Sequence, residues 1–361
     1  MMFKKDQPYN SLPLLPPLIE LETKDILKAA IEANKSLAEL KGIAKTIPNQ
    51  SILISTLPLQ EAKLSSEIEN IATTNDRLYE AFASNSNNYD PQTKEVLRYR
   101  EALWEGYNEL KKNGLLTTNL FVEIYRRING TDAGIRNTPG TKIKNSKGEI
   151  LYTPPEGENI IREKLKNLEV FIHDNEDKID PLIKMALIHY QFEAIHPFTD
   201  GNGRTGRIIN VLYLIQQKQL ELPILYLSRY IIENKNKYYE LLRNVTENKH
   251  WQPWIIYMLN SIKETSEKTA DKIIQIKELF EKTLIESKKK LPSKVYSKEL
   301  LELIFEQPYS KVEFVVNTGI AKRQTAAEYL KELEKIKILK SRKVGKEVLY
   351  LNVKLYELLQ N

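Results

Sequence analysis

The sequence predicts a mainly α-helical protein with two short β-hairpins. Apolar residues recur every three or four positions in most longer segments, for example at 181–194 and 207–215, and this spacing places them on one face of a helix. Hairpins are expected at 141–152 and 339–351, around the turn residues Asn145–Gly148 and Gly345. A chain of 361 residues has room for two or three domains. We expect these domains to cover residues 1–95, 96–286 and 287–361.

The first region begins with an extended arm, because residues 1–20 contain four prolines. A helix is predicted over residues 26–40, with Thr23 or Asp25 as its N-cap. Residues 51–57 follow a loop, and a separate helix rich in alanine and glutamate is predicted from about residue 58 to residue 73.

The second region is expected to be helical apart from its hairpin. Asp180 is the predicted N-cap of the helix at 181–194, and Pro181 fits its first position. The predicted helices, in chain order, are two within 97–128 separated by Lys112-Asn113-Gly114, then 158–173, 181–194, 207–215, 251–259 and a connecting helix at 265–290.

A glycine-rich loop joins the helices at 181–194 and 207–215. Its sequence is His196-Pro197-Phe198-Thr199-Asp200-Gly201-Asn202-Gly203-Arg204-Thr205-Gly206-Arg207. Glycines let successive backbone N–H groups converge on an anion, and the start of the following helix adds unpaired N–H groups and the positive end of its dipole. Arg204 and Arg207 would supply forked donors to phosphate oxygens, and Asn202 an amide donor. The loop is therefore predicted to bind phosphate groups.

His196 and Asp200 add reactive groups to this loop. Histidine titrates near pH 6.5, so His196 can accept a proton at neutral pH, and Pro197 favours an extended backbone that projects it from the preceding helix. Asp200 is a hard oxygen ligand that suits a Mg²⁺ ion bridging phosphates. The glycines also fit the dinucleotide-binding pattern G-x-G-x-x-G, but that fingerprint needs a preceding strand, and a helix is predicted here.

The loop resembles the signature of Fic-domain proteins, His-Pro-Phe-x-Asp-Gly-Asn-Gly-Arg-x-Gly-Arg, at every fixed position. The resemblance implies a Fic helical core and a protein adenylyltransferase, which moves AMP from ATP to a serine, threonine or tyrosine hydroxyl of a target protein or of itself. It makes His196 the general base and Asp200 the ligand of Mg²⁺. The residues that it assigns to ATP are Gly201, Asn202, Gly203, Arg204, Thr205, Gly206 and Arg207.

A second pattern of this family lies nearer the N-terminus. Many Fic proteins carry an inhibitory helix with the pattern Ser/Thr-x-x-x-Glu-Gly/Asn, which Ser65, Glu69 and Asn70 fit. A carboxylate that reaches the phosphate site would pair with Arg207 and remove its donors from the γ-phosphate of ATP. The resemblance therefore implies autoinhibition until this helix shifts.

The resemblance also predicts a flap and a nucleoside contact. In Fic proteins a β-hairpin at the position of 141–152 holds the backbone of the target beside the active site by strand addition. A nucleoside needs a flat apolar wall, and Tyr239 is the predicted contact, with Tyr230 and Tyr238 behind it. His189, in contrast, is expected to be a histidine of the hydrophobic core.

The third region has the element order of a winged helix. Helices are predicted over 297–305, 310–317 and 323–337, before the hairpin at 339–351. Residues 287–361 carry 16 Lys+Arg and 9 Asp+Glu, so they account for the whole net charge of +6. DNA is therefore an alternative partner, although glutamates share the third helix with its basic residues. A winged helix also serves as a protein-interaction or homodimerisation module.

Composition excludes several other classes. The chain has no cysteine, so disulfides, zinc–thiolate sites and cysteine nucleophiles are excluded. No stretch approaches 18 apolar residues and no signal peptide is evident, so we expect a cytoplasmic protein that does not enter the membrane.

Two alternatives to AMP transfer remain open from the sequence. One is the reverse reaction, in which Glu69 orients the attacking water, and the other is a nucleotide-sensing transcriptional regulator.

Overall fold

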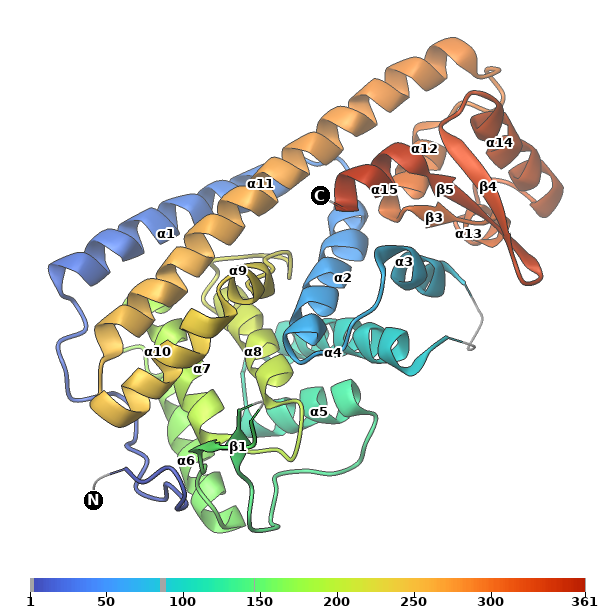
Figure 1. Cartoon of the computed structure of the whole chain (residues 1–361). Helices are drawn as coiled ribbons and strands as arrows, with labels where there is room; N and C mark the ends of the chain where they lie inside the picture. The colour runs from blue at the N-terminus through green and yellow to red at the C-terminus, as the bar shows by residue number, and fades with distance from the viewer. Residues whose placement is uncertain (1–2, 85–88, 146, 361) are drawn as a thin grey trace.

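The computed structural model describes residues 3–84, 89–145 and 147–360, and it is mainly helical, as predicted (Figure 1). Helices of the first and second regions pack around one another, and the long helix α11 runs from this body towards the C-terminal unit (Figure 1). None of the helices in the described ranges is long and apolar enough to cross a bilayer. The two expected region boundaries, after residues 95 and 286, both fall inside helices.

The first region differs from its prediction at Pro58. One helix runs through this residue, where we expected a boundary. A proline inside a helix costs about 3 kcal/mol, but Ile52, Leu53, Leu57 and Leu59 around it are fully buried, and each buried side chain returns roughly 1.5–3 kcal/mol. The helices that precede the first strand are α1 (Lys24–Ala44), α2 (Ser51–Ile68), α3 (Asn75–Ala83), α4 (Pro91–Asn113) and α5 (Thr118–Asn129).

The second region surrounds two helices that pack against each other, α7 and α8. Asp180 caps α7 by accepting a hydrogen bond from Leu182 N–H at 2.8 Å, and Pro181 is its first residue, as predicted. Nearly every side chain of α7 and α8 is buried, so the loop between them has a rigid base. The elements of this region are β1 (Ile143–Lys144), β2 (Ile150–Tyr152), α6 (Glu158–His173), α7 (Pro181–Ile195), α8 (Asn202–Gln216), α9 (Ser228–Glu233) and α10 (Lys235–Asn248).

The predicted flap is present as a small antiparallel hairpin. Strands β1 and β2 pair with Ile143 opposite Tyr152. Residue 146, in the expected turn, lies outside the described residues. The hairpin lies next to the α7–α8 loop, because the Tyr152 hydroxyl donates to the Ala194 carbonyl at 2.7 Å.

Helix α11 (Trp251–Lys290) is one helix of 40 residues where we predicted two. Neither glycine nor proline interrupts residues 254–290, and buried Ile262, Ala270, Ile273 and Ile276 continue one apolar face across the expected break. Its first part packs along α1 (Figure 1).

The C-terminal unit has the three helices and the hairpin that we predicted in winged-helix order. Two elements were not predicted: a short strand, β3, which joins the sheet in the order β3-β5-β4, and a final helix, α15. The elements are α12 (Lys298–Glu306), β3 (Tyr309–Ser310), α13 (Val312–Asn317), α14 (Arg323–Lys335), β4 (Leu339–Val344), β5 (Glu347–Asn352) and α15 (Val353–Gln360).

This unit rests on α2 and α3 of the first region (Figure 1). On the hairpin, Arg342 Nη1 lies 2.7 Å from Asp76 Oδ2 and 3.6 Å from Glu80 Oε2 of α3. Arg342, a basic residue of the β4–β5 hairpin, is therefore already paired with carboxylates of the same chain.

Candidate active site

His196 ends helix α7 in a left-handed conformation, with φ 49° and ψ 59°. Its N–H donates to the Phe192 carbonyl at 3.0 Å, which closes the last turn of the helix. The prediction of an extended backbone before Pro197 was therefore wrong. Capping the helix gives this buried N–H a partner, and the conformation is held by Arg136, whose Nε donates to the His196 carbonyl at 2.8 Å.

The surroundings of His196 keep its imidazole neutral. Burial, followed by the positive charge of Arg136, lowers the pKa of His196 to about 4. The ring is therefore unprotonated at neutral pH and can accept a proton. It lines a pocket of about 410 Å³, together with Glu69, Gly203 and Arg207.

The start of α8 is built on glycines. Gly201 precedes the helix with φ 70°, a left-handed conformation, and a Cβ there would approach Asn129 Nδ2 to 2.6 Å. A Cβ on Gly203 would overlap Glu69 Oε1, and one on Gly206 would press on Glu193 Oε1 at 2.8 Å. The Glu69 carboxylate thus lies directly against the first turn of α8, where backbone N–H groups and the helix dipole favour an anion.

Two of the predicted phosphate ligands use their side chains inside the loop. Asn202 Oδ1 accepts from Phe198 N–H and Asn202 Nδ2 donates to the Phe198 carbonyl, both at 2.9 Å. The Thr205 hydroxyl donates to the Gly201 carbonyl at 3.0 Å. The two side chains therefore brace the loop, and donation from the Asn202 amide to a phosphate group stays a prediction.

Arg204 points away from the pocket. Its guanidinium pairs with Glu95 of α4, donates to Asn129 Oδ1 at 3.2 Å and lies 3.6 Å from Asp200 Oδ2. The side chain is only 1% exposed, so burial and these partners hold it there. Arg204 therefore organises the rim of the loop here, and Arg207 is the loop arginine that lines the pocket.

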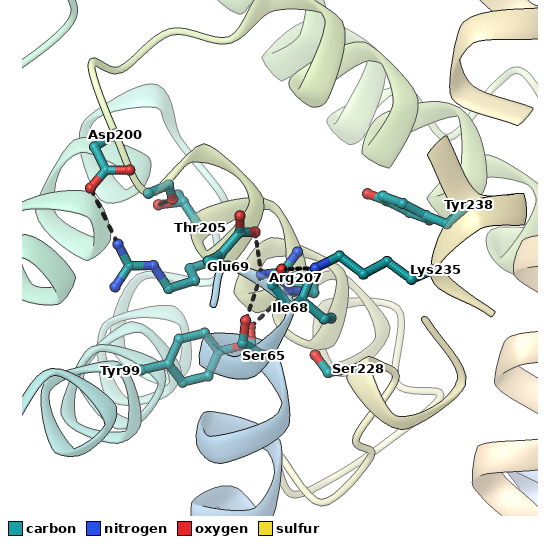
Figure 2. A network of polar contacts seen from close by, with 12 residues as sticks. Ser65, Ile68, Glu69, Tyr99, Asp200, Thr205, Arg207, Ser228, Lys235 and Tyr238 are labelled. Atoms are coloured by element: carbon teal, nitrogen blue, oxygen red, sulfur yellow. Dashed lines mark hydrogen bonds and ion pairs between the residues drawn. The ribbon is translucent and has the colours of Figure 1, made fainter. Parts of the chain in front are cut away.

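Arg207 is held by Ser65 and Glu69, as the second sequence pattern predicts (Figure 2). Its Nε donates to Ser65 Oγ at 2.8 Å, and its Nη2 donates to the Ser65 carbonyl at 2.9 Å and to Glu69 Oε1 at 2.8 Å. Asp200 lies apart from this cluster and faces the guanidinium of Arg204 (Figure 2).

Glu69 is ionised in this arrangement. Burial would raise the pKa of its carboxyl group, but the charge and the hydrogen bond of Arg207 hold the pKa below its ordinary value. Glu69 is the C-cap of α2, and Asn70 follows it with φ 64°. Lys235 donates to the Ile68 carbonyl and so fixes the same helix end (Figure 2).

Two of the three predicted nucleoside-contact tyrosines line the same pocket as the flap residues. Tyr239 lines the pocket and is 44% exposed, and Tyr238 lies edge-on beside it with ring centroids 5.2 Å apart. Tyr230 is buried and does not line the pocket. His189 is a core histidine, as predicted: it contacts the Tyr238 hydroxyl at 2.8 Å and Asn210 Nδ2 at 3.0 Å, and burial lowers its pKa to about 3.

Two carboxyl groups near Arg207 escaped the sequence reasoning, the buried Glu61 and the partly buried Glu193. Burial raises the pKa of Glu61 and of Glu193 to about 7. Glu61 lies on α2 and accepts hydrogen bonds from Ser228 Oγ at 2.6 Å and from the Tyr99 hydroxyl at 3.1 Å. Its spacing of four residues before Ser65 was a usable signal, because it places Glu61 on the same helix face. Glu193 could have been found as the one acidic residue of α7, a helix whose other residues are mostly apolar.

The side chains around the loop suit a Mg²⁺ ion only if substrate phosphates and water supply its other ligands. No group of three or more carboxylate, histidine or cysteine ligands occurs within the described parts of the chain. Asp200, with its side chain 80% exposed, offers one carboxylate at the end of the loop. Mg²⁺ is commonly bound by one or two carboxylates together with substrate phosphates and water, so this single ligand fits that mode.

These features define a helical protein in which a glycine-rich helix start, a neutral histidine and a β-hairpin line one pocket. Three family models match the chain in succession: the N-terminal part of the Fic/DOC family at residues 27–108, the Fic/DOC family itself at 115–214, and the C-terminal domain of SoFic-like protein adenylyltransferases at 279–355. The chain belongs to the Fic/DOC family.

Known relatives agree with this assignment. Protein adenylyltransferase fic-1 of Caenorhabditis elegans is 26% identical over 149 residues, which are 41% of this chain and 27% of that protein. A probable protein adenylyltransferase of Aquifex aeolicus is 38% identical over 73 residues, 20% of each chain. The chain therefore spans about a quarter or less of the length of these two relatives.

Solved structures share the fold. A Fic family protein from Desulfovibrio desulfuricans superposes with a TM-score of 0.60 at 17% identity, over 94% of this chain and 98% of that one. Fic-1 from C. elegans superposes with a TM-score of 0.52 at 21% identity, over 69% of this chain and 73% of that one.

Proposed function

We propose that this chain is a protein adenylyltransferase that transfers AMP from ATP to a hydroxyl group of a target protein, and that Glu69 inhibits it. The observation that carries the proposal is the position of the Glu69 carboxylate. It occupies the anion site at the start of α8, paired with Arg207, in the same pocket as the neutral His196. A site that holds an internal carboxylate in this way suits a phosphate group of similar charge.

The proposed reaction uses His196 as the base. The oxygen of the target hydroxyl attacks the α-phosphorus of ATP, and its proton passes to a nitrogen of the imidazole. The bond between the α-phosphorus and the pyrophosphate oxygen breaks, and pyrophosphate leaves. A pKa of about 4 keeps His196 unprotonated beforehand. The N–H groups of α8 and the Arg207 guanidinium would stabilise the charge that develops on the phosphate oxygens.

Mg²⁺ would be held by Asp200 and would neutralise phosphate charge when bound. Gly201, Gly203 and Gly206 keep the loop backbone close to the phosphates, and Tyr239 provides an aromatic face for the base of the nucleotide. The acceptor would be a serine, threonine or tyrosine of another protein, or of this chain itself, presented along the flap.

The test is AMP transfer by His196→Ala. We expect this variant to lose incorporation of AMP from ATP labelled at its α-phosphate, measured in a Glu69→Ala background, while ATP still binds. The reason is that the substitution removes the proton acceptor and leaves Arg207 and the loop intact. The matched control is His250→Ala, which alters an exposed histidine before α11. AMP transfer by His196→Ala at the same rate as the Glu69→Ala background would refute the assignment of His196 as the base.

One observation also favours the reverse reaction. The Glu69 side chain is 33% exposed and lines the same pocket as His196, so its carboxylate can orient a water molecule there. Offering AMP-modified protein to the parent and to Glu69→Ala separates the two directions. Loss of AMP release in Glu69→Ala, together with gain of AMP transfer, would assign both reactions to this pocket.

A further inference from the structure

The N-terminal arm, residues 3–17, reaches the active-site pocket from outside every matched family segment. The matches begin at residue 27, yet Phe3 lines the pocket with Ile143, Leu151 and Tyr152 of the flap. The arm precedes α1 and has no helix of its own, but Leu12 and Leu15 are buried. The arm is therefore anchored to the core at Leu12 and Leu15, while most of its other residues are exposed.

Polar side chains of α6 and α7 hold the arm by its backbone. Lys164 is only 6% exposed, and its ammonium group donates to the Leu12 carbonyl at 2.8 Å. A buried ammonium group needs such acceptors, because its desolvation is costly. The remaining contacts are Leu15 N–H to Asn167 Oδ1 at 2.9 Å, Asn167 Nδ2 to the Leu15 carbonyl at 3.0 Å, and Gln191 Nε2 to the Pro13 carbonyl at 2.9 Å.

The front of the arm then binds the flap. Tyr9 N–H donates to the Thr153 carbonyl at 3.0 Å, and the Thr153 hydroxyl donates to the Lys5 carbonyl at 2.7 Å. The Phe3 ring stacks on Tyr152, with centroids 5.8 Å apart and planes 24° apart, and meets Tyr9 edge-on at 5.1 Å. An aromatic cluster and two hydrogen bonds thus join the arm to the end of β2.

The flap needs this support, because its strands are only two and three residues long. A two-stranded hairpin is marginally stable in water even when its strands are longer. Tyr152, the residue on which Phe3 stacks, also donates to the Ala194 carbonyl, two residues before His196. The Tyr152 side chain therefore connects the arm and the flap to the last turn of α7, next to His196.

We propose that Phe3 is a positioning residue that holds the flap through Tyr152, so that an acceptor bound along the flap is presented to His196. This inference rests on the proposed function for its effect on AMP transfer. Its effect on the flap does not depend on that function. Because Phe3 acts on the flap side of the pocket, its loss should impair transfer more than ATP binding.

Hydrogen exchange of the flap tests the structural part. We expect residues 143–153 to exchange several-fold faster in Phe3→Ala than in the parent, and Phe3→Tyr to restore the parent rate, because a tyrosine ring can still stack on Tyr152. The control is Leu14→Ala, which truncates an apolar side chain of the same arm that is 46% exposed. Unchanged exchange in Phe3→Ala would overturn the proposal.

AMP transfer tests the functional part, in full-length protein carrying Glu69→Ala. We expect Phe3→Ala to lower self-modification by about five- to tenfold, while the Kd for ATP stays within about twofold of the parent. An equal weakening of ATP binding and transfer would overturn the positioning role. If Glu69→Ala itself transfers no AMP, the proposed function fails, and the exchange experiment still decides whether the arm holds the flap.

Discussion

Under the proposed function, removing the Glu69 carboxylate should raise the rate of AMP transfer, and the contacts of Glu69 set the size of the effect. In Glu69→Ala, Arg207 loses the charge-assisted hydrogen bond at 2.8 Å but keeps both contacts to Ser65, so α2 stays in place. A hydrogen bond to a charged group contributes about 1.5–3 kcal/mol. In the variant, a phosphate of ATP no longer has to compete with the Glu69 carboxylate for Arg207. Since 1.4 kcal/mol corresponds to a factor of ten, the rate at limiting ATP should rise by about 10- to 150-fold.

The assay is the initial rate of self-modification with ATP labelled at the α-phosphate, at ATP concentrations below its KM, together with the Kd for ATP. Glu67→Ala is the matched control, because it removes the same charge from the same end of α2, and Glu67 does not line the pocket. Equal rates for Glu69→Ala and the parent would refute inhibition through Arg207. Equal activation by Glu67→Ala would show that any loss of negative charge from this helix end is sufficient.

Three further predictions concern titrating and buried groups. First, kcat/KM for ATP in Glu69→Ala should stay level from pH 8 to pH 5.5, because the pKa of His196 is about 4; a decline centred near pH 6.5 would contradict the buried, neutral base. Second, Arg136→Met should move any acidic decline to higher pH, since it removes a positive charge that lowers the pKa of His196, and should lower the free energy of unfolding by about 2–4 kcal/mol. Third, the pKa of Glu61 is raised to about 7, so the stability that its protonated form contributes is present below pH 4.5 and is lost as the pH rises through 7. In urea unfolding, Glu61→Gln should therefore gain stability relative to the parent between pH 5 and pH 8, by at most about 1.4 kcal/mol per pH unit. A difference between the two proteins that does not change with pH would contradict this.

The parts of the site that depend on neighbouring residues could be predicted from the sequence. Asp180 and Pro181 start α7, and Gly201 takes the left-handed conformation from which α8 begins, because helix N-caps and glycine turns are decided by nearby residues. The left-handed conformation of His196 was not predicted, because Pro197 favours an extended backbone at the residue before it. The pairing of Glu69 with Arg207 crosses 138 residues, and only the family pattern made it predictable.

The remaining features depend on partners that no local pattern reveals. Arg204 turns from the pocket because Glu95, 109 residues earlier, is beside it. Phe3 lines the pocket because the arm packs on α6 and α7. The helix break expected at Pro58 failed for the same reason, since burial of the surrounding apolar side chains outweighs a local preference.

The position of Glu69 at the end of α2 has a consequence for how its carboxylate could leave Arg207. Terminal residues of a helix fray far more readily than interior ones, and Glu61 and Ser65 anchor the preceding turns through separate buried contacts. Unwinding this last turn would break the contacts of Lys235 with Ile68 and of Arg207 with Glu69, and would withdraw the carboxylate while the rest of the helix remains docked. Release of the carboxylate would then require no rigid-body movement of whole domains.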